Sequence, residues 1–318
     1  MYYSILHKTR FRYSAPVSEA VTEVRMQPRS EGNQRCLSFR LTTVPPARVN
    51  TYTDCYGNTV HHFDIPAPHR LTTITAEAIV ILQPPQLLPD RLDPDAWTAL
   101  DALTASEDHW DFLAPSAFAH RTPLLDDLAR ELDLRRRDDP LSLLIELNRR
   151  LYDAFAYDAE HTDVDSPIDV ALAARRGVCQ DFAHIMIALV RLLRIPCRYV
   201  SGYLFHQVEN HDRSAEDATH AWIEALLPEL GWVGFDPTNN LIAGERHIRT
   251  AVGRDYADVP PTRGVYKGRA EEILEVGVKV VPTEAPIPDD EVLPTLASVA
   301  VPAEATEGLL GQQQQQQQ

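Results

Sequence analysis

Hydrophobic and polar residues alternate through the first quarter of the chain, in short runs that turn-forming residues separate. The runs richest in β-branched and aromatic residues are Ser4 to Tyr13, Cys36 to Val44, Val49 to Asp54 and Leu71 to Leu82. Alternation over this length predicts strands with one buried face. Several short strands at such spacing are typical of a sandwich of antiparallel strands. We therefore expect residues 1–85 to form an antiparallel β-sandwich-like domain.

Beyond residue 85 the period of the pattern changes from two to that of a helix. Residues 86–120 read as a connector, and apolar residues then recur at helical spacing from Leu124 to Leu132. Pro140 suits the first turn of a second helix. Helices followed by further alternating runs predict a second domain of the α+β class, which we place at residues 121–282.

The longest apolar helix pattern runs from about Val178 to Arg194 and has Cys179 in its first turn. One interpretation is that Cys179 fills the core together with Phe182 and Met186, because free cysteines are often buried. The other is that it is a nucleophile, since the unpaired N–H groups and the macrodipole of a first helical turn stabilise a thiolate. This helix alone leaves both interpretations open.

Two alternating runs on either side of residues 227–229 predict an antiparallel hairpin. If Leu226 opposes Leu230, His220 lies directly opposite Asp236. Directly opposed residues point to the same face with Cβ atoms about 4.5–5.5 Å apart. A carboxylate there accepts from one imidazole nitrogen and leaves the other free. The same register pairs Trp222 with Gly234 and Glu224 with Trp232.

Cys179, His220 and Asp236 together supply a nucleophile, a base and the residue that orients the base. Each residue alone also has a structural interpretation, His220 as a strand histidine and Asp236 as a turn residue. The three in this order predict a cysteine enzyme with a catalytic triad.

Composition narrows the function classes. The hydrophobic content of 44% and charged content of 24% match a soluble globular protein. A formal net charge of −16 argues against a nucleic-acid partner. The four cysteines, Cys36, Cys55, Cys179 and Cys197, follow no disulfide or zinc spacing. His206, His211 and Cys179 are an irregular set, so we expect no metal and no cofactor.

The two ends of the chain carry little information on chemistry. The first residues lack a continuous apolar segment, and no uninterrupted apolar run of about 18 residues occurs elsewhere. We therefore expect no membrane partner and a cytoplasmic location. Residues 283–318 are rich in Pro, Glu and Ala, end in a glutamine run from Gln312 and are expected to be disordered.

Three segments of the second domain resemble the bacterial transglutaminase-like superfamily: GVCQDFA at 177–183, THAWIE at 219–224 and GWVGFDPTN at 231–239. In the first domain, YSAPVSEA at 13–20 and YGNTVHHF at 56–63 resemble the β domain that often precedes this core in bacteria. The resemblance covers roughly residues 1–282.

The resemblance implies a papain-like core in which the helix bearing the cysteine packs on an antiparallel sheet. It also implies roles for Cys179 as nucleophile, His220 as general acid/base and Asp236 as orienter. Animal transglutaminases place an upstream aromatic residue in the oxyanion hole, and its equivalent cannot be placed from this sequence. The backbone N–H of Cys179 is the one donor that can be named.

The expected function is cysteine-dependent acyl transfer on amide or peptide bonds through a thioester, with hydrolysis of a protein or peptide substrate as the first choice. The alternatives are cross-linking by a protein-glutamine gamma-glutamyltransferase and a non-catalytic binding protein on the same fold. The sequence does not define the substrate or the oligomeric state.

Overall fold

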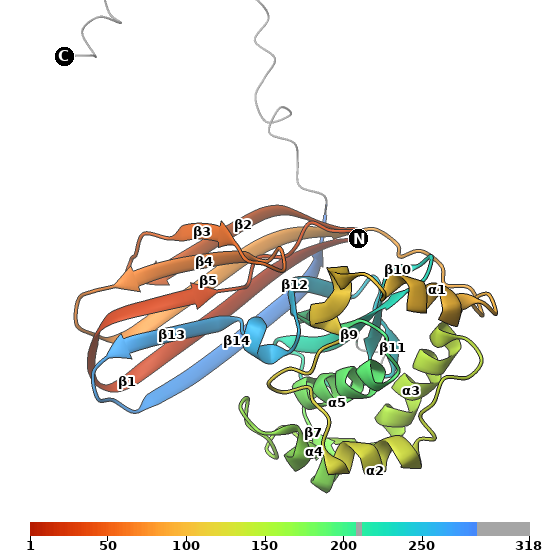
Figure 1. Ribbon diagram of the computed structural model, residues 1–318. Helices are drawn as coiled ribbons and strands as arrows, with labels where there is room; N and C mark the ends of the chain where they lie inside the picture. Colours follow the sequence, from red (N-terminus) through yellow and green to blue (C-terminus); the bar gives the residue numbers. More distant parts are fainter. Residues whose placement is uncertain (208–211, 285–318) are drawn as a thin grey trace, which may run out of the picture. The chain divides into compact units, whose positions relative to one another are not determined.

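The computed structural model describes residues 1–207 and 212–284. The tail predicted to be disordered, residues 283–318, therefore lies outside the described residues apart from its first two positions. The chain is of the predicted α+β class, with an antiparallel sheet built mostly from the N-terminal strands and a mixed helix and strand core (Figure 1). No helix among the described residues is long and apolar enough to cross a lipid bilayer.

The N-terminal sheet is organised around one long strand, β1 (Tyr2–Val24). The first half of β1 pairs with β5 and β14, and its second half pairs with β4 and β13. The sheet therefore curls, and an apolar cluster that includes Val24, Phe63 and Ile74 fills its inside. The bounds of its other strands are β2 (Gln34–Val44), β3 (Asn50–Thr53), β4 (Thr59–Ile65), β5 (His69–Leu82), β13 (Thr262–Lys267) and β14 (Glu272–Thr283).

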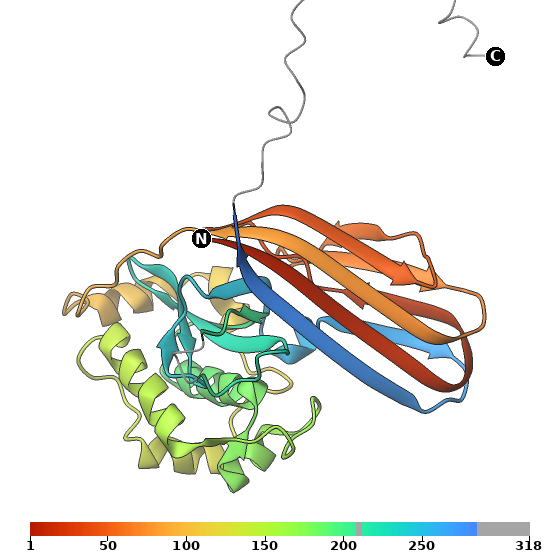
Figure 2. The ribbon, with the colours of Figure 1, turned by 180° about the vertical axis from the view of Figure 1, so that it is seen from behind.

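The last two strands differ from the expected domain division, which assigned residues 121–282 to the core. β14 pairs with β1 from Tyr2 opposite Thr283 to Tyr13 opposite Glu272, and Figure 2 shows the two strands side by side. β5 covers one edge of the first half of β1, and β14 pairs with the opposite edge and satisfies its backbone groups. No local pattern indicates this pairing, because β14 and β1 lie far apart in the sequence.

Two helices of the core begin at side-chain caps. Thr122 accepts from the N–H of Leu125 ahead of α2, and Asp139 accepts from the N–H of Leu141 ahead of α3, with proline at the first position of each helix. The helical elements are α1 (Ala96–Leu103), η1 (Glu107–Phe112), α2 (Pro123–Glu131), α3 (Pro140–Ala154), α4 (Ile168–Ala174), α5 (Cys179–Leu192) and η2 (Tyr256–Asp258).

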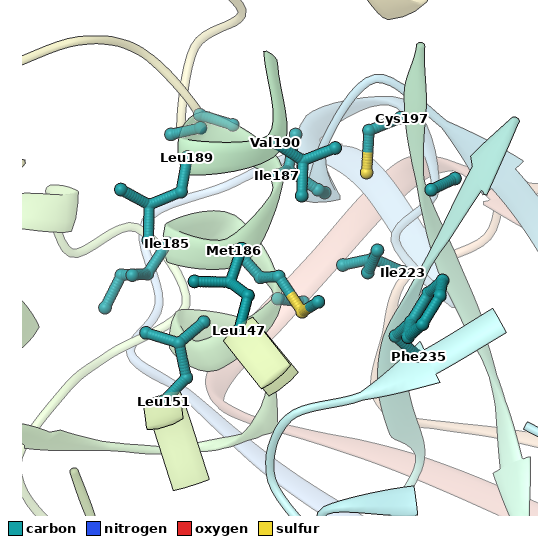
Figure 3. Packing of buried hydrophobic residues seen from close by; sticks show 14 of the residues in the cluster. Leu147, Leu151, Ile185, Met186, Ile187, Leu189, Val190, Cys197, Ile223 and Phe235 are labelled. Carbon is teal, nitrogen blue, oxygen red and sulfur yellow. The ribbon is translucent and has the colours of Figure 1, made fainter. Parts of the chain in front are cut away.

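A five-stranded antiparallel sheet in the order β11-β10-β9-β8-β12 carries α5 on one face (Figure 3). Met186 and Val190 of α5 pack towards Ile223 and Phe235, and Cys197 is wholly buried in the same cluster. The strands of the core are β6 (Ala156–Tyr157), β7 (Arg176–Gly177), β8 (Cys197–Leu204), β9 (His220–Leu227), β10 (Gly231–Asp236), β11 (Leu241–Ile242) and β12 (His247–Gly253).

The β9–β10 hairpin forms, but its register differs from the predicted one. Leu226 pairs with Trp232 instead of Leu230, and Glu224 pairs with Gly234, because the turn spans 228–230 instead of 227–229. Glu229 and Gly231 take positive φ there, which shifts the turn by one residue. The slip along the partner strand is two residues, so every side chain keeps its predicted face.

β12 is an edge strand of the core sheet, and two wholly buried amide side chains of the N-terminal sheet cover it. Gln34 accepts from the N–H of Arg249 at 2.9 Å and donates to its carbonyl oxygen at 2.8 Å. Asn58 makes the same paired contact with Val252, at 2.8 Å in both directions. The backbone groups that an edge strand leaves unpaired are thereby satisfied.

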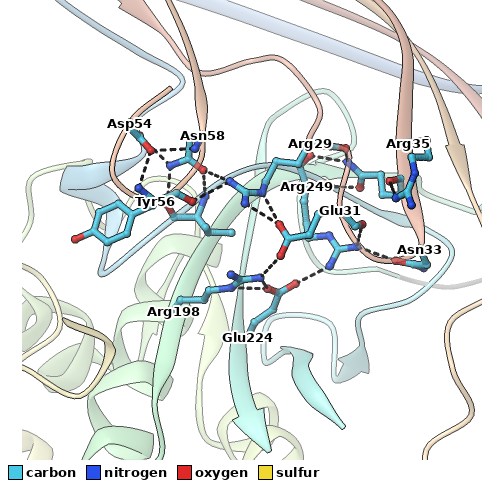
Figure 4. Close-up of polar contacts among 12 residues, drawn as sticks. Arg29, Glu31, Asn33, Arg35, Asp54, Tyr56, Asn58, Arg198, Glu224 and Arg249 are labelled. Atoms are coloured by element: carbon cyan, nitrogen blue, oxygen red, sulfur yellow. Dashed lines mark hydrogen bonds and ion pairs between the residues drawn. The ribbon is translucent and has the colours of Figure 1, made fainter. Parts of the chain in front are cut away.

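An ion-pair network lies beside this edge (Figure 4). Glu224 of β9 accepts from Arg198 of β8, with an N–O distance of 2.6 Å, and from Arg249 of β12 at 3.2 Å. Arg198 also contacts Glu31 of the N-terminal region at 3.2 Å. The Arg198 and Glu224 side chains are only 7% and 3% exposed, so each charge depends on the others for compensation.

Replacing Glu224 by Gln should destabilise the fold by about 3 kcal/mol, because it leaves buried guanidinium groups without their anion. Urea unfolding measures this change. Arg149→Ala is the control, since its pair with Asp153 is exposed and should change stability by less than about 0.5 kcal/mol. Equal effects of the two substitutions would contradict the prediction.

Candidate active site

Cys179 is the first residue of α5, as predicted, and is partly buried. The helix start is fixed by Asp181, which accepts from the N–H of Val178 at 2.8 Å and from the Thr162 hydroxyl at 2.6 Å. A side chain at Gly177 would clash with the Asp181 side chain, so the loop before the cysteine requires glycine. The thiol thus sits among the unpaired N–H groups of the first turn.

His220 begins β9 and is buried. Its Nε2 donates to Oδ2 of Asp236 at 2.8 Å, and the two side chains are at most 1% exposed. Because of the register slip, the two residues are diagonal rather than directly opposed, but they share one face of the sheet. Nδ1 of His220 has no hydrogen-bond partner of normal geometry within the described ranges.

The electrostatics of the pair favour its charged form. Burial alone would lower the pKa of His220, but the Asp236 carboxylate outweighs burial and, with a contribution from the Cys179 side chain, raises the pKa to about 10. Burial would raise the pKa of Asp236, but His220 and His247 outweigh it and hold the pKa well below its ordinary value. An imidazolium beside a carboxylate is therefore the state at neutral pH.

Asp236 accepts five hydrogen bonds. Oδ1 accepts from the backbone N–H groups of Thr238 and Asn239, at 3.1 and 3.2 Å. Oδ2 accepts from His220, from the Asn239 amide at 2.9 Å and from Nε2 of His247 at 3.2 Å. Asn239 lies three residues after Asp236 in a turn, a position that a sequence can indicate. His247 follows an unrelated loop, and no local pattern predicts it.

Tyr157 is a second residue that the sequence did not single out. It belongs to β6, which pairs in parallel with β7 directly ahead of Cys179. Burial raises the pKa of Tyr157, the Cys179 side chain raises it further, and a hydrogen bond from the backbone N–H of Ala215 opposes both. The effect of the Cys179 side chain on this pKa places the Tyr157 hydroxyl in the neighbourhood of the thiol.

One buried cluster has the residue types of a metal site: the nitrogen and oxygen atoms of His220, Asp236 and His247 lie within 4.8 Å of one another. In the protein these atoms hydrogen bond to one another, and both imidazoles donate to the carboxylate. His206, His211 and Cys179 form the irregular set of possible metal ligands in the sequence. Nδ1 of His206 lies 3.4 Å from Oδ2 of Asp212, and His211 is outside the described residues.

The cysteine at a helix start beside an antiparallel sheet is the arrangement of papain-like proteins. Residues 126–237 match the transglutaminase-like superfamily, and residues 3–81 match the bacterial transglutaminase-like N-terminal region. An uncharacterized protein of Mycobacterium tuberculosis is 36% identical over 299 residues, covering 89% of this chain and 93% of its own length. The chain belongs to the transglutaminase-like superfamily, in its bacterial two-domain form.

Two further comparisons bear on the fold and on the reaction. A protein of Cytophaga hutchinsonii, whose crystal structure is described as that of a cysteine protease, has a TM-score of 0.70 at 22% identity, covering 90% of this chain and 92% of its own. This likeness shows the fold. A protein-glutamine gamma-glutamyltransferase of Pseudomonas aeruginosa is 30% identical over 160 residues, which cover 47% of this chain and 24% of the enzyme.

Asp236→Asn should change how stability depends on pH. His220 holds its proton to about pH 10 in the folded protein but only to about pH 6.5 when unfolded. Its contribution to stability is therefore complete below about pH 6.5 and is lost as the pH rises towards 10, by at most about 1.4 kcal/mol per unit. The substitution removes the anion, so the decline should become shallower. Urea unfolding of both proteins between about pH 6 and 10 tests this, and parallel curves would refute it.

Proposed function

We propose that this protein is a cysteine acyl-transfer enzyme that acts on amide or peptide bonds through a thioester. The observation that carries the proposal is the buried hydrogen bond of 2.8 Å between His220 and Asp236, formed on the sheet that packs against the helix starting at Cys179. A buried anion that keeps an imidazole protonated supports a neighbouring thiolate.

In the proposed reaction the Cys179 thiolate attacks the carbonyl carbon of an amide, forming a C–S bond and a tetrahedral oxyanion. The oxyanion collapses, the C–N bond breaks, and His220 gives its Nδ1 proton to the departing amine. A water then gives a proton to His220 and its oxygen attacks the thioester carbon; the C–S bond breaks, which releases the carboxylic acid and restores the thiolate beside the protonated His220. Asp236 holds the imidazole in place and stays ionised throughout.

The oxyanion needs donors aimed at the attacked carbonyl. The backbone N–H of Cys179 is one, because it lies in the unpaired first turn of α5. The Tyr157 hydroxyl is the second, and it supplies the aromatic donor that the family resemblance implies. Its nearness to Cys179, whose side chain raises the pKa of Tyr157, supports this role.

We propose hydrolysis of a protein or peptide amide as the reaction, as in a transglutaminase-like amidase or peptidase. Transfer of the acyl group to a primary amine is the second candidate, and the identity with the Pseudomonas aeruginosa gamma-glutamyltransferase favours it. The two differ only in which nucleophile reaches the thioester, since the Cys179, His220 and Asp236 roles are common to both.

The purified protein should convert glutaminyl amides or peptides, and Cys179→Ala should abolish the conversion. Mass spectrometry with and without an added primary amine distinguishes the reactions, because ammonia loss means deamidation, amine incorporation means cross-linking, and backbone cleavage means proteolysis. Cys55→Ala is the control, since this exposed cysteine lies in a turn of the N-terminal sheet. Conversion that survives Cys179→Ala would refute the proposal.

Tyr157→Phe should lower the turnover by about 10²-fold, the usual effect of removing one oxyanion donor. The binding constant for the substrate should change little, because the donor acts in the transition state. Tyr13→Phe removes a hydroxyl from the N-terminal sheet, which is remote from the proposed reaction, and should leave the rate unchanged. An unaltered rate in Tyr157→Phe would contradict the role of Tyr157 and leave the backbone N–H of Cys179 as the one proposed donor to the oxyanion.

A further inference from the structure

Asp236 is shared by two buried histidines. His220 contacts its Oδ2 from β9, and His247 contacts the same oxygen from the start of β12, with Nε2–Oδ2 distances of 2.8 and 3.2 Å. The proposed reaction assigns a role to the first and none to the second. Both imidazoles are more than nine-tenths buried, so neither hydrogen bond competes with solvent.

The tautomer of His247 is defined by its other ring nitrogen. The backbone N–H of Gly244 donates to Nδ1 at 3.3 Å, which makes Nδ1 an acceptor and places the ring proton on Nε2. Nε2 therefore donates to Asp236. Gly244 and His247 are also joined by a backbone hydrogen bond of 3.2 Å, so the loop that carries the ring is fixed.

Burial, with help from the neighbouring cations, keeps His247 neutral. Burial lowers the pKa of His247, Asp236 opposes this effect, and His220 and Arg246 lower the pKa further. The titratable groups that face His220 are Asp236, Cys179 and His206. The positive charge of the cluster thus rests on His220, and His247 remains a neutral donor.

We infer that His247 is a positioning residue of the proposed active site, which holds the Asp236 carboxylate in line with His220 by donating from Nε2 to Oδ2. The inference rests on the proposed function. A neutral donor orients the carboxylate without competing with His220 for its charge. A second imidazolium in this place would weaken the pair between His220 and Asp236.

A cavity of about 540 Å³ adjoins His247 on the side remote from α5 and makes the inference testable. Its walls include Leu87, Trp222, Trp232, Ala243 and His247. The His247 ring meets the Trp222 indole edge to face, with centroids 5.2 Å apart. Removing the imidazole would leave a hole continuous with this cavity, large enough to admit a free imidazole molecule.

Two substitutions separate the hydrogen bond from packing. His247→Phe keeps an aromatic ring but has no donor, whereas His247→Gln retains an N–H that reaches Asp236. We expect His247→Phe to lower the pKa of His220, read from its ring resonances by NMR, by about one unit or more. It should also slow alkylation of Cys179 by iodoacetamide at neutral pH by about 10-fold. His247→Gln should keep both values near those of the wild type.

Free imidazole provides an independent test in His247→Ala. Added imidazole should enter the enlarged cavity, donate to Asp236 and restore the alkylation rate, and N-methylimidazole, which has no ring N–H, should not. His7→Gln is the matched control, because His7 of β1 is equally buried but hydrogen bonds to Thr9 of the same strand and to Tyr203 of β8, not to Asp236. Its alkylation rate should equal that of the wild type.

An unchanged titration of His220 in folded His247→Phe would overturn the inference, as would equal losses in the Phe and Gln variants together with no effect of imidazole. Failure of the proposed function has a different signature. In that case Cys179 of the wild type is alkylated no faster than free cysteine, while the His220 titration still reports on His247.

Discussion

The hydrogen bond between His220 and Asp236 is the interaction on which the rest of the site depends. Two opposite charges are held where solvent does not reach them, and removing such charges from water costs several kcal/mol per ion. The cost is offset because Asp236 accepts four further hydrogen bonds, two from the turn after it and two from Asn239 and His247. A carboxylate with every acceptor position occupied has one orientation, and this orientation fixes the imidazole.

The cysteine is placed by a different kind of interaction. Met186 and Val190 of α5 lie over Ile223 and Phe235, which alternate in sequence with His220, Trp222 and Asp236 on their strands. The apolar face of the sheet therefore holds the helix, and the opposite face holds the polar pair. Because interiors are close-packed, α5 cannot slide on the sheet without opening voids. The position of Cys179 relative to His220 is thus a consequence of core packing.

The sequence predicts this arrangement as far as local periodicity allows. The helix start at Cys179 and the shared face of His220 and Asp236 follow from the pattern, and the shared face survives a two-residue error because face depends only on whether the slip is odd or even. His247 and Tyr157 could not be predicted, since their positions follow from how β12 and β6 pair with distant strands. β14 illustrates the same limit, because its place in the N-terminal sheet depends on pairing with β1, which lies far away in the sequence.

The N-terminal sheet contributes to the site through the edge of the core sheet. His247 begins β12, and the backbone of β12 pairs with the side-chain amides of Gln34 and Asn58 instead of a further strand. An edge strand without such partners would exchange its hydrogen bonds with water and move more freely. Glu224 adds a second constraint, because it lies on the same face of β9 as His220 and ties β9 to β8 and β12 through Arg198 and Arg249. The N-terminal sheet therefore acts on Asp236 through β12 and His247, which explains physically why the two parts belong to one compact unit.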